Sequence, residues 1–192
     1  MLKFIHGTDY QQFDPNLFTA AVQSQFPGTQ VNSEGDNVDL GTPGFVTVDL
    51  PDADQAAVLA ILTSALPAAI AAQQIAQAKT AKNTLVMAAA DQLRAQMMAD
   101  YSDLEQSSFP YQLADAQAWT KDNTATTPWL SAMAVARGTT VAVLAPKVIA
   151  NDAAWTALAG KIIGQQQAYQ DQVTAATTVD AVNAINPAYQ TS

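Results

Sequence analysis

The chain has 192 residues, of which 49% are hydrophobic and 13% are charged, with a formal net charge of −9 and no cysteine. This length allows one compact domain, or a small domain with a helical extension, and the abundance of alanine favours helices. The lack of cysteine excludes disulfides and thiolate chemistry, and the acidic balance without a cluster of Lys or Arg argues against nucleic-acid binding.

The negative charge is concentrated near the N-terminus. Residues 1–54 contain one base, Lys3, and eight acids, a net of −7, whereas the remaining residues contain seven bases and nine acids, a net of −2. The eight acids are Asp9, Asp14, Glu34, Asp36, Asp39, Asp49, Asp52 and Asp54. Three of them lie in SEGDNVDLG, which weakly resembles a calcium loop, but the alternating ligand order is missing and a hairpin turn is the better interpretation.

The first fifty residues predict the order strand, helix, strand, strand. LKFIH predicts the first strand, and Asp14 followed by Pro15 is typical of a helix start, with an end near Pro27-Gly28. Apolar residues then alternate at Val31, at Val38 and Leu40, and from Phe45 to Leu50, with turn signals at Gly35-Asp36 and Gly41–Gly44, which predicts the strands after the helix. This order predicts a small α+β module over residues 1–66.

A second helix is expected to begin at Pro51-Asp52 and to cover the sheet. Its apolar stripe consists of Val58, Ile61, Leu62, Ala65 and Leu66. Pro67 should kink or end it. The uncharged stretch Gln55–Ala78 is long enough to be weighed as a membrane span, but its alanines, Pro67 and three glutamines favour a core-facing amphipathic helix. We therefore expect no membrane partner.

Residues 67–106 read as one long connecting helix, because Gly and Pro are almost absent. Apolar residues recur at steps of three and four, which predicts a seam that packs on a partner within the chain or on another subunit. The seam consists of Val86, Ala90, Leu93, Met97, Tyr101 and Leu104.

Residues 107–192 predict a helical C-terminal domain. Ser108 and Thr127 are interpreted as helix starts with Pro110 and Pro128 in the first turns, and Gly138 as a stop.

A long helix follows, with a heptad seam of Val141, Val148, Trp155, Ile162 and Tyr169. Its intermediate positions are only partly apolar, which favours a bundle helix, or a coiled coil with polar layers, over a long zipper. Thr177 with Asp180 resembles a capping box before a final short helix, and the residues after Pro187 are expected to fray.

The sequence contains little that predicts catalysis. His6 is the single histidine, so a histidine-based metal site is excluded, and no nucleophile elbow, phosphate loop or dinucleotide motif is present. Asp100, Asp103 and Glu105 are interpreted as a solvated helix face. We expect a protein without enzymatic activity, cofactor or metal; the rival hypothesis is a hydrolase using His6 and the N-terminal acids.

Large aromatic side chains concentrate in the C-terminal half, where they either fill an alanine-rich core or anchor an interface. The core is the favoured interpretation, and Trp129 beside Pro128 is the best surface candidate. The candidate interaction residues are Trp129, Trp119, Tyr111, Trp155 and Arg137.

The order of short motifs from about Leu93 to Ile185 resembles a family of C-terminal domains found in tailed-phage tail and tail-fibre proteins. The motifs are Glu105 before Phe109-Pro110 and Gln112, ADAQAW, Thr127–Leu130, Ala136–Gly138, Ile163–Gln166 and AATTVDAVNAI. Family members carry arginine after the aliphatic-Gly step, where this chain has glutamines.

The resemblance implies a non-enzymatic tail structural or adaptor protein near the fibre or baseplate. It would be assembled in the host cytoplasm into the virion tail, would contact other tail or fibre proteins, and is a possible homo-oligomer. The alternative is a tail-fibre assembly chaperone absent from the mature virion.

Overall fold

The structure, a computed structural model, describes residues 1–36 and 42–191. It combines a small N-terminal three-stranded sheet with a mostly helical remainder, which confirms the expected α+β class. Two compact units are present, Met1–Ala78 and Lys79–Ser192, with their boundary inside one helix. The boundaries predicted after residues 66 and 106 remain predictions of domain organisation.

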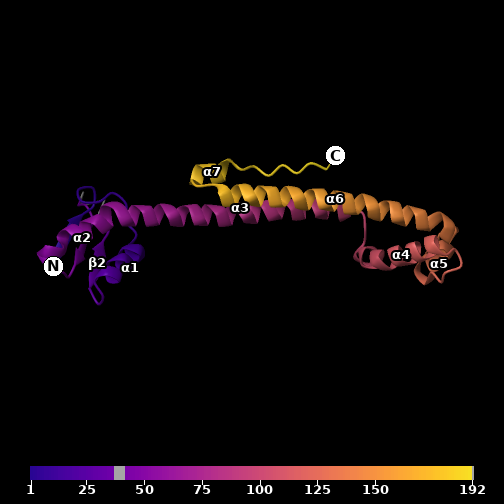
Figure 1. The fold of residues 1–192 in the computed structure, drawn as a ribbon, viewed down its shortest axis with the longest axis horizontal. Coiled ribbons are helices and arrows are strands. Elements are labelled where there is room, and N and C mark those ends of the chain that lie inside the picture. The colour runs from indigo at the N-terminus through magenta and orange to yellow at the C-terminus, as the bar shows by residue number, and fades with distance from the viewer. Residues whose placement is uncertain (37–41, 192) are drawn as a thin grey trace. The chain divides into compact units, whose positions relative to one another are not determined.

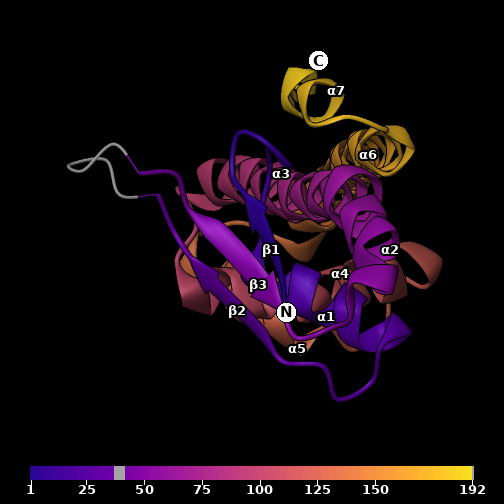
Figure 2. The ribbon, with the colours of Figure 1, turned by 90° about the vertical axis from the view of Figure 1, so that its left-hand side faces the viewer.

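The sheet of the first unit consists of β1 (Leu2–Ile5), β2 (Val31–Glu34) and β3 (Phe45–Val48). Its order is β1-β3-β2 and both pairings are antiparallel, as Figure 2 shows. Because side chains alternate between the two faces of a strand, Leu2 and Phe4 face the core opposite Val48 and Val46. The strands predicted from LKFIH, Val31 and Phe45 are confirmed; Val38 and Leu40 of the alternating pattern lie outside the described residues.

Two helical segments supply the rest of this core. Helix α1 (Pro15–Gln25) begins where predicted, because the Asp14 carboxylate accepts hydrogen bonds from the Asn16 and Leu17 amides at 2.9 Å. It contributes the fully buried Phe18 and Val22, and the second segment contributes Val58, Ile61, Leu62 and Leu66. Four of the five residues predicted for the apolar stripe of the second segment are therefore buried, whereas the fifth, Ala65, is exposed.

The second segment continues through Pro67 instead of ending there. It consists of a 3-10 turn (Asp52–Asp54), α2 (Gln55–Ala60), a π-helical turn (Ile61–Ala65) and α3 (Leu66–Met98). In the π-helical turn the Leu66 amide donates to the Ile61 carbonyl five residues back. This wider turn accommodates a proline, which has no N–H to donate and whose ring crowds the preceding turn.

By length and composition, the described residues include one helix that could cross a membrane, Asp52–Met98. The bent pair Pro128–Ala136 and Val141–Ala175 also passes that test as a single broken span. Within Asp52–Met98, the stripe residues Val58, Ile61, Leu62 and Leu66 are buried in one core with residues of the sheet and α1. This burial agrees with the interpretation of the stripe as core-facing.

The predicted helix over residues 67–106 is wrong at its C-terminal end. Helix α3 ends at Met98, and α4 (Asp103–Lys121) begins after Ser102, whose hydroxyl accepts a hydrogen bond from the Glu105 amide at 3.2 Å. Ser102 and Glu105 have the spacing of a capping box, and the acids in the first turn favour a helix start here. Tyr101 and Leu104, predicted to lie on the seam, are consequently exposed, whereas Val86 and Ala90 are buried.

Ser108 does not start a helix, which corrects the second prediction in this region. It lies buried inside α4, where its hydroxyl donates to the Glu105 carbonyl at 2.7 Å and accepts from the side-chain amide of Gln112 at 2.8 Å. Pro110 is likewise inside α4 and exposed. The start at Ser102 prevails because its hydroxyl caps a free amide, whereas the Ser108 hydroxyl is engaged within the helix.

The second unit has a compact head made of α4, α5 (Pro128–Ala136) and the first part of α6 (Val141–Ala175). Leu130 and Ala134 of α5 meet Ala116 of α4 and Leu144 and Ala145 of α6. The start of α5 at Pro128 agrees with the prediction, and Gly138, with φ +60°, stops the chain after it. The first heptad positions of α6 thus pack within the chain.

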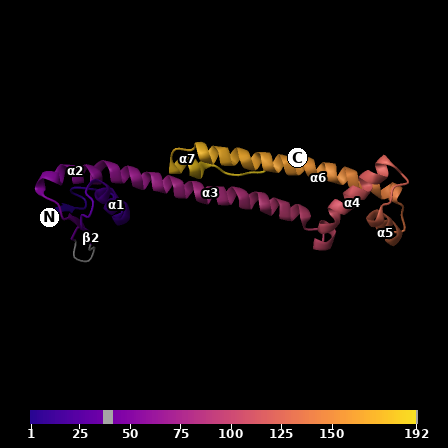
Figure 3. The ribbon, with the colours of Figure 1, turned by 60° about the horizontal axis from the view of Figure 1, so that its bottom comes forward.

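The second part of α6 lies along α3 from Lys79 onward, as Figures 1 and 3 both show. The Lys79 ammonium donates to the Thr174 carbonyl at 2.7 Å. The C-terminal α7 (Val179–Ala184) is capped by Thr178, one residue beyond the predicted cap, because its hydroxyl accepts from the Ala181 amide.

The expected fraying after Pro187 is not observed. The Tyr189 hydroxyl donates to the Val86 carbonyl at 2.8 Å, and Gln165 exchanges two hydrogen bonds with the backbone of Gln190 at 2.7 and 3.0 Å. Gln165 is one of the polar positions of the heptad seam. At this position a polar side chain holds the extended C-terminal segment.

Replacing Asp14 with alanine should lower the local stability of α1 by about 1 kcal/mol, because two amides lose their acceptor. Native-state hydrogen exchange of the α1 amides measures this effect. Asp14→Asn retains an acceptor and is the matched control. Equal loss of protection in the two variants would contradict the capping role.

Candidate functional site

The head of the second unit presents an exposed aromatic pair. The rings of Tyr111 on α4 and Trp129 on α5 stack with centroids 5.4 Å apart and an interplanar angle of 11°. Tyr111 is 56% exposed and Trp129 is 41% exposed. Because stacking fixes both rings while leaving them open to solvent, the pair is a preorganised contact surface of the kind found at interfaces.

The position of Trp129 depends on Asp115 of α4. The Asp115 side chain is buried, and one carboxylate oxygen accepts hydrogen bonds from the Trp129 amide at 2.8 Å and the Leu130 amide at 3.0 Å. It thereby satisfies two of the free amides at the start of α5, a task for which the preceding Thr127 provides no side-chain cap. A carboxylate at a helix N-terminus is also favoured by the helix dipole.

Further apolar side chains of α5 and α6 are exposed in the same unit. Val135 and Val143 are 83% and 45% exposed, and Ala132 and Ala136 are exposed beside them in the sequence. From residue 123 to residue 146 the single charged side chain is Arg137. A surface of this composition loses little by desolvation when a partner covers it. We call the stacked rings of Tyr111 and Trp129 the aromatic surface.

The five sequence-predicted interaction residues lie in three places. Tyr111 and Trp129 form the stack, and Trp119 is half-buried against the head core. Trp155 and Arg137 line a pocket of about 740 Å³ in the same unit. The structure therefore stacks Tyr111 on Trp129, places Trp155 and Arg137 in the lining of one pocket, and gives Trp119 a core role.

Sequence reasoning missed Asp115 and the pocket methionines. Asp115 lies fourteen residues before Trp129, and no local motif connects an acid in one helix with the start of the next. Met97, Met98 and Met133 line the pocket and are three of the five methionines of the chain. Their number in residues 97–133 is a compositional signal that could have indicated an adaptable apolar site.

His6 forms a separate polar cluster in the first unit. Its Nδ1 lies 2.7 Å from an Asp36 carboxylate oxygen, and its Nε2 lies 3.2 Å from the Gln11 carbonyl. The Gln11 carbonyl and the Asp36 carboxylate raise the pKa of His6. The hydrogen bond from the Gly44 amide lowers the pKa of Asp36 most, and His6 lowers it further.

This geometry favours the imidazolium form, because both ring nitrogens face acceptors. In this geometry the Gln11 carbonyl faces Nε2, a nitrogen that the rival hydrolase hypothesis would need as a general base.

Calcium binding by the same acids also finds no geometric support. Asp36 is engaged by His6 and by the Gly44 amide, and Asp39 lies outside the described residues. Across residues 1–36 and 42–191, no group of three or more His, Asp or Glu side chains is arranged to hold a metal ion.

One known family matches part of the second unit. The HI1402 helical domain family matches residues 150–187, which span the second part of α6, α7 and the following residues. This match supports a helical C-terminal domain family over less than half of the chain. No curated protein and no solved structure matches the chain.

Replacing Asp115 with alanine should lower the free energy of unfolding by about 1–3 kcal/mol, because two α5 amides lose their acceptor in a buried setting. Urea-induced unfolding of the full-length chain measures this loss. The control is Asp122→Ala, which removes a carboxylate hydrogen-bonded to Thr124 in an exposed turn and should change stability by less than about 0.5 kcal/mol. Equal effects of the two substitutions would refute the special role of Asp115.

The His6–Asp36 pair predicts a pH dependence of the first unit. The pair should contribute its full stabilisation of the folded state between about pH 4 and 6.5, which are the pKa values of Asp and His in the unfolded chain. Above this window it is lost as His6 deprotonates through its raised folded pKa, and below it as Asp36 protonates through its lowered one. NMR titration of the His6 ring should give a lower pKa in Asp36→Asn; an unchanged pKa would contradict the pairing.

Proposed function

We propose that this protein is a non-enzymatic component of a bacteriophage tail, an adaptor near the fibre or baseplate that acts through protein–protein contacts. The observation that carries the proposal is the aromatic surface, where Tyr111 and Trp129 stack and remain open to solvent. The tail assignment is supported by the resemblance over residues 93–185. The match at residues 150–187 concerns a helical domain and adds nothing about tails.

The aromatic surface supports a contact function for physical reasons. Tyrosine and tryptophan bury large areas at a small cost in conformational entropy, and they dominate the energetics of interfaces. Here both rings are fixed before binding, because Asp115 holds the start of α5 against α4. A preordered surface loses less entropy on association than a mobile one.

The charge distribution supports a division of labour between the units. Residues 1–54 carry a net of −7, whereas the segment of the aromatic surface is nearly uncharged. The first unit is suited to an electrostatically steered contact and the second to an apolar one. We propose that the partners are other tail or fibre proteins, with no nucleic acid or membrane among them.

Mass spectrometry of purified virions tests the assignment directly. The protein should be present at a fixed ratio to known tail proteins. Presence in the infected-cell lysate together with absence from the virion would favour a tail-fibre assembly chaperone. Absence of any co-purification with tail or fibre proteins in either sample would overturn both assignments.

Trp129→Ala should reduce incorporation of the protein into virions at least about tenfold, because the stacked surface loses its larger ring. Quantitative mass spectrometry of virions from complemented infections measures incorporation. The matched control is Leu104→Ala, which removes a 76%-exposed apolar side chain of the same unit outside the aromatic surface. Equal incorporation of Trp129→Ala and the control would exclude the aromatic surface as the contact.

A further inference from the structure

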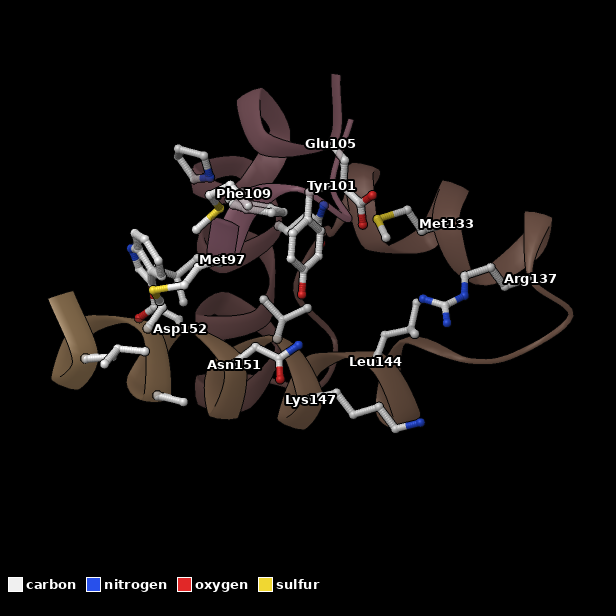
Figure 4. A pocket seen from close by; sticks show the side chains of 18 residues that line it. Met97, Tyr101, Glu105, Phe109, Met133, Arg137, Leu144, Lys147, Asn151 and Asp152 are labelled. Atoms are coloured by element: carbon white, nitrogen blue, oxygen red, sulfur yellow. The ribbon is translucent and has the colours of Figure 1, made fainter. Parts of the chain in front are cut away.

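The pocket of the second unit is distinct from the aromatic surface. It has a volume of about 740 Å³ and lies between the end of α3, the turn at Tyr101, and helices α4, α5 and α6 (Figure 4). Two features open it. The chain turns away after Met98, and the neighbouring core is built largely of alanines, which leave space between helices that larger side chains would fill.

The lining of the pocket is mostly apolar and adaptable. Met97 and Met133 approach it from α3 and α5, and Trp155 from α6. The rings of Tyr101 and Phe109 pack edge to face with their centroids 5.3 Å apart, and both residues line the pocket. Methionine side chains adjust to irregular apolar shapes, and a volume of this size is within the range of small-molecule sites.

Charged groups are distributed unevenly around this apolar lining. Figure 4 shows Arg137 and Lys147 on one side of the pocket, Asp152 on the opposite side and Glu105 near Met133. Among residues 1–36 and 42–191, no carboxylate lies within ion-pair distance of Arg137 or Lys147, since the one ion pair there joins His6 and Asp36. The lining thus contains two of the eight basic residues of the chain and two acids, Glu105 and Asp152, with neither base ion-paired to either acid.

We propose that this pocket binds an elongated apolar carboxylate of the fatty-acid type. The apolar chain lies between Met97, Met133 and Trp155, and the carboxylate is bound by Arg137 and Lys147. A guanidinium matches a carboxylate in geometry and charge, and its hydrogen bonds to a carboxylate are stronger than those between neutral groups. This inference is independent of the proposed tail function, because it uses a different set of contacts.

Trp155 provides a reporter for the test. In the full-length Trp119→Phe/Trp129→Phe variant it is the single remaining tryptophan. Dodecanoate carrying a terminal bromine, added below its micellar concentration, should quench Trp155 fluorescence with a saturable dependence on concentration. The uncharged bromododecanol should bind about tenfold more weakly, because it offers no charge to Arg137 and Lys147. Calorimetric titration of the unsubstituted protein with dodecanoate provides a second measurement without the tryptophan changes.

Two matched pairs of variants locate the site. Arg137→Gln/Lys147→Gln should abolish the preference for the acid over the alcohol, whereas Lys3→Gln/Lys121→Gln makes the same change in net charge at residues outside the lining and should preserve it. Ala154→Phe places a ring in the pocket and should reduce dodecanoate affinity at least about tenfold, since it takes up the volume of the chain. Ala153→Phe, at an exposed position of α6 outside the lining, should leave the affinity unchanged.

Three results would overturn the inference. The first is the absence of saturable quenching together with the absence of a calorimetric signal. The second is equal affinity for the acid and the alcohol, which would show that the basic residues take no part. The third is equal loss of affinity in Ala154→Phe and Ala153→Phe.

Discussion

The bond between the Asp115 carboxylate and the start of α5 is the contact on which the head of the second unit depends. The helices that meet there are short or rich in alanine, so their packing area is modest, and α5 has only nine residues. An isolated helix of this length is unstable in water. A buried carboxylate that accepts two of its free amides therefore fixes both its start and its position against α4. The stacking of Tyr111 on Trp129 follows from that fixed start.

Small side chains explain why a pocket and a core coexist in the same head. Ala116, Ala134 and Ala145 allow close approach of the helices where they meet. The same residue type supplies little volume where the helices diverge, and methionines and aromatic rings then form walls around the space. The pocket is thus a consequence of building a bundle largely from alanine. Its basic residues, in contrast, are not required by the packing.

The sequence predicted the first unit well because its signals are local. Asp14 before Pro15 and the alternation in β1 and β3 each determine an element without reference to distant residues. The end of α3 was missed although Ser102 and Glu105 form a recognisable capping pair, because the uninterrupted apolar period concealed it. The hydrogen bond from Trp129 to Asp115 and the one from Tyr189 to Val86 were not predictable, because each joins residues far apart in the chain.

Polar residues in the seam of α6 carry a structural role that a hydrophobic pattern cannot indicate. Gln165 presents an amide whose oxygen accepts from the Gln190 backbone and whose nitrogen donates to it, as a paired strand would. A leucine at this position would bury more apolar area but leave the extended segment without a partner. The half-apolar heptad is therefore suited to a helix with two kinds of neighbour, other helices on its apolar positions and an extended chain on its polar ones. Such a seam is satisfied within one chain, and for that reason it does not itself require a second subunit.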